Sequence, residues 1–220
     1  MSKKSTKNNG YAQLELYISN GNFTSKITEE PTIKQFEKVI GEKTILVAQC
    51  VLNTEEHFPC RYTKDGTPRK NRREYINLDN EDYDGKKIDY VEKDPAWSGA
   101  DNEWLYCLAY DKHIVKIGQT IGDLKSRYQS YSCGTFRAMK IGNCSTTNFI
   151  VSECNYLAVR LGMEVEIYGI PVPKKEVKTN RFGTTKMCVL SLVRDQETML
   201  TQTFKTTYSH KPFLCVQEGK

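Results

Sequence analysis

The spacing of apolar residues divides the first half of the chain into short segments that favour strands and helices. YAQLELYIS, from Tyr11, alternates apolar and polar positions and predicts a strand, and the apolar, β-branched run KTILVAQCVLN predicts another. Between them, PTIKQFEKVIG has helical spacing, with Pro31 at its first turn and Gly41 where the helix closes.

The second half continues this alternation of strands and helices. WLYCLAY and HIVKIGQT predict two strands joined through Asp111 and Lys112, with Gly118 ending the second strand. A helix is expected from about Asp123, in IGDLKSRYQSYS, and a second in STTNFIVSECNYLAVRLG, which Gly162 ends. The remaining segments are a strand in MEVEIYGIPVP, a basic loop in KKEVKTNRFGTTK, the apolar run MCVLSLV, a helix in RDQETMLTQTFKTTY and the tail SHKPFLC.

An acidic stretch separates the two halves. Residues 77–103 (NLDNEDYDGKKIDYVEKDPAWSGADNE) have little periodicity and predict a linker. We therefore expect an N-terminal α+β extension over residues 1–100 and a second domain over residues 101–220.

Composition excludes some classes of protein. No stretch of the 220 residues approaches 18 consecutive apolar positions, and MSKKSTKNNG lacks the apolar core of a signal peptide. We expect a soluble, cytoplasmic protein that does not enter a membrane. None of the eight cysteines forms a CxxC pair, and Cys107, Cys154 and Cys188 lie in apolar runs, which favours buried reduced thiols over disulfides or zinc ligands.

The distribution of charge favours a polyanionic partner. The net charge is +5, and the stretch Cys60–Arg73 (CRYTKDGTPRKNRR) has six cations and one Asp. Its Asp65-Gly66 pair predicts a hairpin turn, and a basic two-stranded ribbon of this kind fits the major groove of DNA. From Trp104 onward the chain has 16 Lys and Arg against 9 Asp and Glu. A solvated basic surface is the open alternative for either region.

An ordered set of short motifs then connects the second half to a known family. Tyr106 ends the triplet WLY, Lys116 opens KIG about ten residues later, and Arg127 and Tyr131 share one face of the following helix. Glu197 lies on the late helix that precedes the KPF tail. Over residues 104–216 this combination resembles the GIY-YIG nuclease family.

Three positions depart from the family pattern. The first triplet has lost its Gly, and Lys116 replaces the usual second Tyr, a replacement similar to that in one branch of Type II restriction endonucleases. Cys215 stands where many members have an Asn.

The resemblance implies a metal-dependent endonuclease fold and a set of roles. The fold class would be α/β (α+β), a small and mostly antiparallel sheet flanked by helices. Glu197 would hold one Mg²⁺ or Mn²⁺ ion per active site, and Arg127 would bind the phosphate oxygens. Tyr106, with Lys116 beside it, would activate the attacking water, since a phenol of ordinary pKa (~10) is a poor base without a nearby cation. Tyr131 would bind the phosphate or the nucleophile.

Each of these residues also has an ordinary interpretation. Lys116 could extend to solvent, Glu197 and Arg127 could lie on helix surfaces, and Tyr131 could pack against the sheet. Glu153 is a weaker candidate for a metal ligand.

The function that we predict is a Type II restriction endonuclease acting on double-stranded DNA as a homodimer, since two-fold DNA symmetry matches a two-fold protein. The alternatives are a low-specificity homing, phage, viral or repair nuclease of the same family, and an inactive DNA-binding protein. The N-terminal extension would bind DNA or dimerise. The predicted DNA contacts are Arg61, Lys64, Arg69, Lys70, Arg72 and Arg73 in the first basic stretch, and Lys174, Lys175, Lys178, Arg181 and Lys186 in the second.

Overall fold

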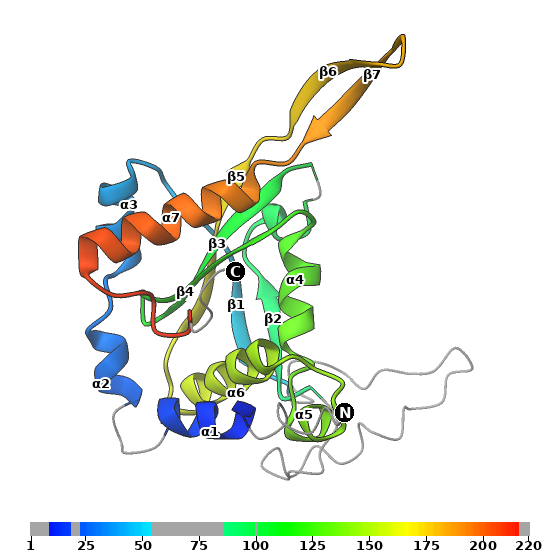
Figure 1. Cartoon of the computed structure of the whole chain (residues 1–220). Coiled ribbons are helices and arrows are strands. Elements are labelled where there is room, and N and C mark those ends of the chain that lie inside the picture. The colour runs from blue at the N-terminus through cyan, green and yellow to red at the C-terminus, as the bar shows by residue number, and fades with distance from the viewer. Residues whose placement is uncertain (1–8, 19–22, 54–85, 100, 216–220) are drawn as a thin grey trace. The chain divides into compact units, whose positions relative to one another are not determined.

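The computed structural model describes residues 9–18, 23–53, 86–99 and 101–215, which form helices and strands of the α+β class (Figure 1). The helices are α1 (Asn9–Ile18), α2 (Phe23–Thr28), α3 (Ile33–Ile40), α4 (Leu124–Tyr131), α5 (Phe136–Ile141), α6 (Thr146–Arg160) and α7 (Val193–Tyr208), with a short 3₁₀ helix, η2, at Pro95–Trp97. The strands are β1 (Ile45–Leu52), β2 (Ile88–Glu92), β3 (Glu103–Tyr110), β4 (His113–Thr120), β5 (Val165–Val172), β6 (Lys175–Arg181) and β7 (Thr184–Leu190).

Two sheets contain all of the described strands. The larger has five strands in the order β2-β1-β5-β3-β4, and the smaller is the antiparallel pair of β6 and β7. The predicted fold class, a small sheet with flanking helices, is confirmed. None of the described helices is long and apolar enough to cross a membrane.

The chain forms two compact units that alternate along the sequence. The first comprises residues 1–26, 49–91 and 128–165, and the second comprises residues 27–48, 92–127 and 166–220. Both units therefore take residues from each side of the predicted boundary at residue 100. The roles assigned to an N-terminal extension stay predictions.

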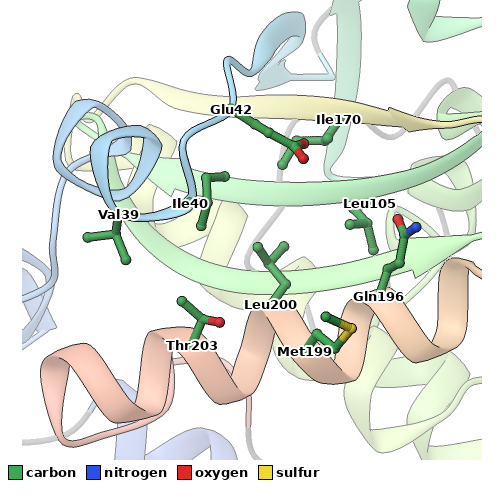
Figure 2. Close-up of a pocket in the computed structure, with 9 residues that line it drawn as sticks. All are labelled: Val39, Ile40, Glu42, Leu105, Ile170, Gln196, Met199, Leu200 and Thr203. Atoms are coloured by element: carbon green, nitrogen blue, oxygen red, sulfur yellow. The ribbon is translucent and has the colours of Figure 1, made fainter.

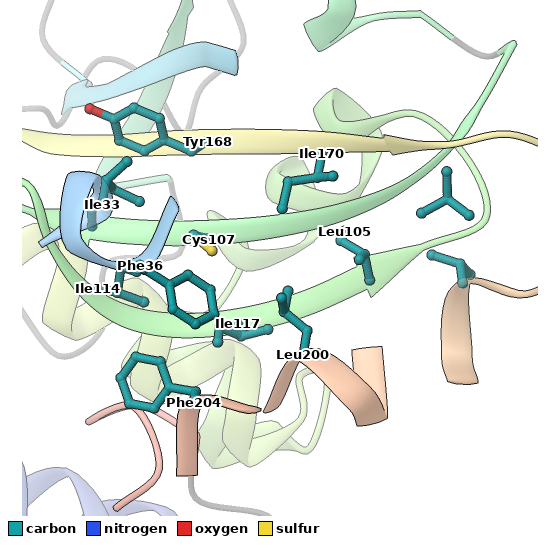
Figure 3. Packing of buried hydrophobic residues seen from close by; sticks show 13 residues of the cluster. Ile33, Phe36, Leu105, Cys107, Ile114, Ile117, Tyr168, Ile170, Leu200 and Phe204 are labelled. Carbon is teal, nitrogen blue, oxygen red and sulfur yellow. The ribbon is translucent and has the colours of Figure 1, made fainter. Parts of the chain in front are cut away.

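The core of the second unit lies on one face of the β3–β4 hairpin (Figure 3). On this face Leu105, Cys107 and Ile117 pack against residues of α7, including Leu200 and Phe204. The members of this cluster are all buried: Ile33, Phe36, Leu105, Cys107, Ala109, Ile114, Ile117, Tyr168, Ile170, Val172, Val193, Leu200 and Phe204. Because side chains alternate along a strand, the residues between them on β3 point to the opposite face.

Helix α3 forms in the predicted segment and is capped at both ends. Thr32 is the N-cap and forms a capping box with Gln35, and Gly41 closes the helix in the left-handed conformation, at φ 72°. Pro31 lies outside the helix, directly before the N-cap, so its predicted place in the first turn is wrong. The predicted strand β1 and the predicted helices α4, α6 and α7 are likewise confirmed.

The exposed edge of β4 is covered by the end of the chain. The N–H of Leu214 donates to the carbonyl of Val115 at 2.6 Å, and the N–H of Ile117 donates to Cys215 Sγ at 3.4 Å. Strand β4 is the last in the sheet order, so its outward backbone groups need such partners. Cys215 thus binds the backbone of Ile117, the middle residue of the KIG triplet.

The first unit contains a buried ion pair. Lys87 Nζ lies 2.9 Å from Glu153 Oε2, and both side chains are buried. The ammonium group also lies 4.8 Å from the ring centroid of Tyr156 and 5.0 Å from that of Phe136. Glu153, the weaker metal-ligand candidate, is therefore engaged by a lysine.

Two predicted elements are wrong. The segment from Tyr11 lies in helix α1, where Leu14 is buried and Leu16 is exposed, whereas a strand would place both on one face. Its Ala, Gln, Leu and Glu are strong helix formers, and this preference prevails over the alternation. Residues 86–103 are not an irregular linker, because they contain strand β2 and the buried Trp97 of η2.

Two further expectations are also corrected. The predicted basic loop at residues 174–186 forms most of the β6–β7 hairpin, and Cys188 on β7 is exposed, whereas Cys107 and Cys154 are buried as expected. The predicted basic ribbon is not among the corrected expectations and stays a prediction, because its residues lie outside the described part of the chain: Arg61, Lys64, Arg69, Lys70, Arg72 and Arg73.

Candidate active site

Tyr106 and Lys116 lie on the same face of the β3–β4 hairpin. Tyr106 pairs with Gly118 and Leu108 pairs with Lys116, so Tyr106 and Lys116 are diagonal neighbours across the two strands. Diagonal neighbours of this kind have backbones about 7–8 Å apart, within reach of long side chains. The face that they share is opposite to the apolar core formed with α7.

Gly118 gives the Tyr106 ring its position. A Cβ atom at residue 118 would overlap with Cζ and Oη of Tyr106 and would lie 2.8 Å from its Cε2. The ring therefore lies across the glycine, in space that any other residue would fill. The Gly of the KIG triplet is required by this close approach, and it lies within β4, which continues to Thr120, so the prediction that it ends the strand is wrong.

We expect Gly118→Ala to destabilise the protein by about 1–3 kcal/mol, the usual cost of forcing extra volume into a packed site. The buried Tyr106 ring would have to move and would lose its contact with Arg127. Urea denaturation would measure the loss. Gly122→Ala is the matched control, because its Cβ would meet only Thr120 Oγ1, at 4.0 Å. Equal stabilities of the two variants would contradict this account of Tyr106.

Helix α4 brings Arg127 to the tyrosine. Asp123 Oδ1 accepts a hydrogen bond from the Ser126 N–H at 2.6 Å, which caps the helix, and Leu124 is fully buried. One turn further along, Arg127 Nε donates to Tyr106 Oη at 3.3 Å. A guanidinium group thus contacts the phenol directly.

Glu197 on α7 completes the cluster. Burial raises the pKa of its carboxyl group, and the positive charges of Lys116, Arg127 and Arg194 partly offset this shift. Val193 and Leu200, one turn before and one turn after, are buried and fix the rotation of the helix. The positive charges of three residues, from two helices and a strand, therefore act on a half-buried carboxylate.

Lys116 is buried within this cluster. Its side chain is only 9% exposed, so it does not extend into solvent as its ordinary interpretation would require. Within the described part of the chain it forms neither a hydrogen bond nor a direct ion pair, and its charge acts on Glu197 at longer range. A strand lysine in this position provides positive charge to a site that also contains a phenol and a carboxylate.

The donor set fits a metal that needs few protein ligands. Among the described residues no three His, Cys, Asp or Glu side chains gather closely enough to form a protein-built metal cage. Mg²⁺ commonly keeps several waters and takes one or two carboxylates. Glu197 can supply one such carboxylate.

The other predicted residues are distributed as follows. Tyr131 is fully buried and packs edge-on against Tyr128, with ring centroids 5.4 Å apart, and its proposed catalytic role stays untested. Lys174, Lys175, Lys178 and Lys186 are exposed on or next to the β6–β7 hairpin, and Arg181 is the last residue of β6.

Two residues near the site were not assigned a role from the sequence. Arg194 acts electrostatically on Glu197 from one helical turn away, a spacing that could have indicated it. Cys215 binds the backbone of Ile117, and no local pattern signals a contact across 98 positions.

A pocket of about 400 Å³ lies between α3 and α7 (Figure 2). Six of its nine lining residues are apolar, including Val39, Ile40, Leu105 and Leu200, and the polar members are Glu42, Gln196 and Thr203. None of Tyr106, Lys116, Arg127 and Glu197 lines it. The pocket therefore does not define the candidate active site.

Comparison with known proteins gives similarity to two nuclease structures. No protein-family model matches the chain, and no curated protein matches it significantly. Restriction endonuclease HPY188I in complex with product DNA aligns with a TM-score of 0.48 and 21% identity, over 89% of this chain and 91% of that one. A mutant of bacteriophage T4 EndoII aligns with a TM-score of 0.43 and 15% identity, over 80% and 95%. These similarities are too low to transfer an activity or a residue role.

Proposed function

We propose that this chain is a metal-dependent DNA endonuclease of the GIY-YIG type, most similar in its motifs to Type II restriction enzymes. The proposal is supported above all by one observation. Tyr106, Lys116, Arg127 and Glu197 span 91 positions of sequence, yet they form one electrostatic cluster in the second unit. Their chemical types are those that phosphodiester hydrolysis needs: a proton acceptor, two cations and a carboxylate.

Each residue has a role that its surroundings support. Arg127 would bind the non-bridging phosphate oxygens with its planar guanidinium group while remaining hydrogen-bonded to Tyr106. Tyr106 would take the proton from the attacking water or orient that water, and the positive charge of Lys116 would favour the phenolate form. Glu197 would hold a single Mg²⁺ or Mn²⁺, which when bound supplies Lewis-acid stabilisation of the phosphate.

The assembly would be a homodimer. One active site per chain cuts one strand, so cleavage of both strands of a duplex calls for two chains related by the two-fold symmetry of the DNA.

Incubation of the protein with plasmid DNA and Mg²⁺ tests the proposed function. Discrete fragments are expected from a site-specific restriction enzyme, and EDTA should prevent them. Nicks or a smear would instead indicate a low-specificity nuclease of the same family. No cleavage with Mg²⁺ or Mn²⁺ would refute the endonuclease and favour an inactive DNA-binding protein.

The DNA contacts proposed for the two basic segments predict a change in salt dependence. Each phosphate contact contributes a slope of about −0.9 to the logarithmic plot of affinity against salt. Replacing Lys174, Lys175, Lys178 and Lys186 together by Ala should flatten the slope by up to about 3.6. Replacing Arg69, Lys70, Arg72 and Arg73 by Ala should also flatten it.

A second set of four lysines provides the control. Lys34, Lys38, Lys93 and Lys205 are exposed elsewhere in the second unit, so their replacement removes equal charge. If both sets change the slope alike, the effect comes from net charge, and the hairpin is only a solvated surface.

A further inference from the structure

The tip of the β6–β7 hairpin presents an aromatic residue that the turn itself disfavours. The strands pair from Lys175 with Leu190 up to Arg181 with Thr184, which leaves Phe182 and Gly183 as a two-residue turn. Both have positive φ, 55° and 73°, the conformation for which Asn, Asp and Gly are the usual residues. A bulky side chain at such a position is strained. Turn geometry therefore does not explain the phenylalanine.

Phe182 is also the most exposed large apolar residue of the described chain. Its side chain is 93% exposed, and Met187, Val189 and Leu190 on β7 are exposed as well. In Figure 1 the two strands extend away from β5 and α7, the elements that precede and follow them. Large apolar side chains gathered on one exposed element are typical of an interaction site.

The charge of the hairpin identifies the partner as a polyanion. Residues 174–190 contain four Lys and one Arg against a single Glu. Lys178 pairs directly with Met187 across the strands, so positive and apolar side chains lie on the same face. A protein interface would favour apolar contact without this excess of lysine, whereas nucleic acid takes both a cationic ribbon and an apolar tip.

The dimensions of the hairpin suit duplex DNA. Seven residues of strand reach about 23 Å at ~3.3 Å per residue, and a groove that admits a two-stranded ribbon is ~12 Å wide. The ribbon is thus long enough to place its tip at the base pairs while its lysines reach the phosphates.

We propose that Phe182 is a wedge that inserts between two stacked base pairs of duplex DNA and unstacks them. The inference rests on the proposed function, because it takes DNA as the substrate. Apolar side chains that enter the stack in this way kink and unwind the duplex. Because pyrimidine–purine steps unstack most readily, they are the expected sites of insertion, and the hairpin selects sequence by deformability.

Unwinding can be measured without cleavage and without a known recognition site. Relaxed closed-circular plasmid is incubated with saturating full-length protein in EDTA, together with a topoisomerase that needs no divalent metal. The protein is then removed and the plasmid topoisomers are separated on a gel. Wild-type protein should leave negative supercoils, because the duplex was relaxed while it was unwound.

Variants assign the effect to the tip. Phe182→Ala should abolish the supercoils and weaken DNA affinity by roughly 5- to 150-fold, the range measured for removing one base–aromatic stack. Phe182→Trp should retain unwinding, and Ile141→Ala, which removes an exposed apolar side chain from helix α5, should behave as wild type. The wedge would be refuted if Phe182→Ala leaves the same negative supercoils as wild type, or if wild-type protein leaves none.

The outcomes separate this inference from the proposed function. A wild-type protein that cuts plasmid in Mg²⁺ but leaves the linking number unchanged would refute the wedge and preserve the endonuclease. A wild-type protein that changes the linking number but never cuts plasmid in Mg²⁺ would support the wedge and refute the endonuclease. If Phe182→Ala instead dissociates the chain into monomers in the absence of DNA, the tip binds a second copy of the chain and the wedge is wrong.

Discussion

Glu197→Gln is expected to abolish DNA cleavage in Mg²⁺ while DNA binding survives or tightens. The substitution keeps the size of the side chain and removes the carboxylate proposed to hold the metal. Metal stabilisation of a phosphate is worth several kcal/mol, so the single-turnover rate should fall by at least roughly 10³-fold. Binding should persist, because Lys116, Arg127 and Arg194 lose the negative charge that they now face.

Asp195→Asn provides the matched control, since Asp195 is an exposed acid two positions earlier on the same helix. Asp195→Asn should cleave DNA at the wild-type rate. Gel mobility shifts in EDTA should give similar DNA affinities for wild type, Glu197→Gln and Asp195→Asn. If Glu197→Gln cuts as fast as wild type, Glu197 is not the metal ligand and the assignment of the site fails with it.

The parts of the site that the sequence could predict are those with a strong local pattern. The alternation in β3 and β4, together with Asp111 in the connection and Asp123 before the helix, predicted the hairpin and the helix that follows it. The position of Lys116 needed the structure. Leu108 pairs with Lys116 but Ala109 pairs with Ile114, so β4 has one extra residue, Val115, at a bulge.

This bulge places the lysine in the site. In a regular strand Ile114 and Lys116 would share a face, and a lysine would interrupt the apolar core. With the extra residue, Ile114 and Ile117 both enter the core, and Lys116 lies on the opposite face with Tyr106. The sequence of one chain contains no repeating pattern from which the position of such a bulge could be predicted.

The hairpin was missed for a different physical reason. Every residue of β7 is exposed, so the two strands bury no apolar face and lack the alternation by which strands are recognised. Stability here comes from backbone pairing and from β-branched residues such as Thr184, Thr185 and Val189. A ribbon without a buried face is expected where the partner, and not the core, covers the strands.

The second large effect is expected from Lys116→Met. If Lys116 favours the Tyr106 phenolate or activates water directly, its removal should damage catalysis more than binding. General-base assistance is typically worth about 10²- to 10⁴-fold, and the single-turnover cleavage rate should fall by that amount. Met preserves most of the stem of this buried side chain, so the melting temperature should stay unchanged. Lys205→Met, at an exposed position of α7, should leave the rate unaltered.

The pH dependence of the residual rate distinguishes a catalytic lysine from a structural one. Glu197 must be ionised to hold a metal, and Lys116 is the first of the cations that lower the pKa of this carboxyl group. Without the lysine that pKa rises further, so the acid limb of the pH–rate profile should move to higher pH. Lys116→Tyr, which introduces the residue usual in the family that these motifs resemble, should recover part of the rate, while the acid limb should stay at the higher pH. A Lys116→Met enzyme within a few-fold of wild type, with an unmoved acid limb, would show that the lysine only fills space in the sheet.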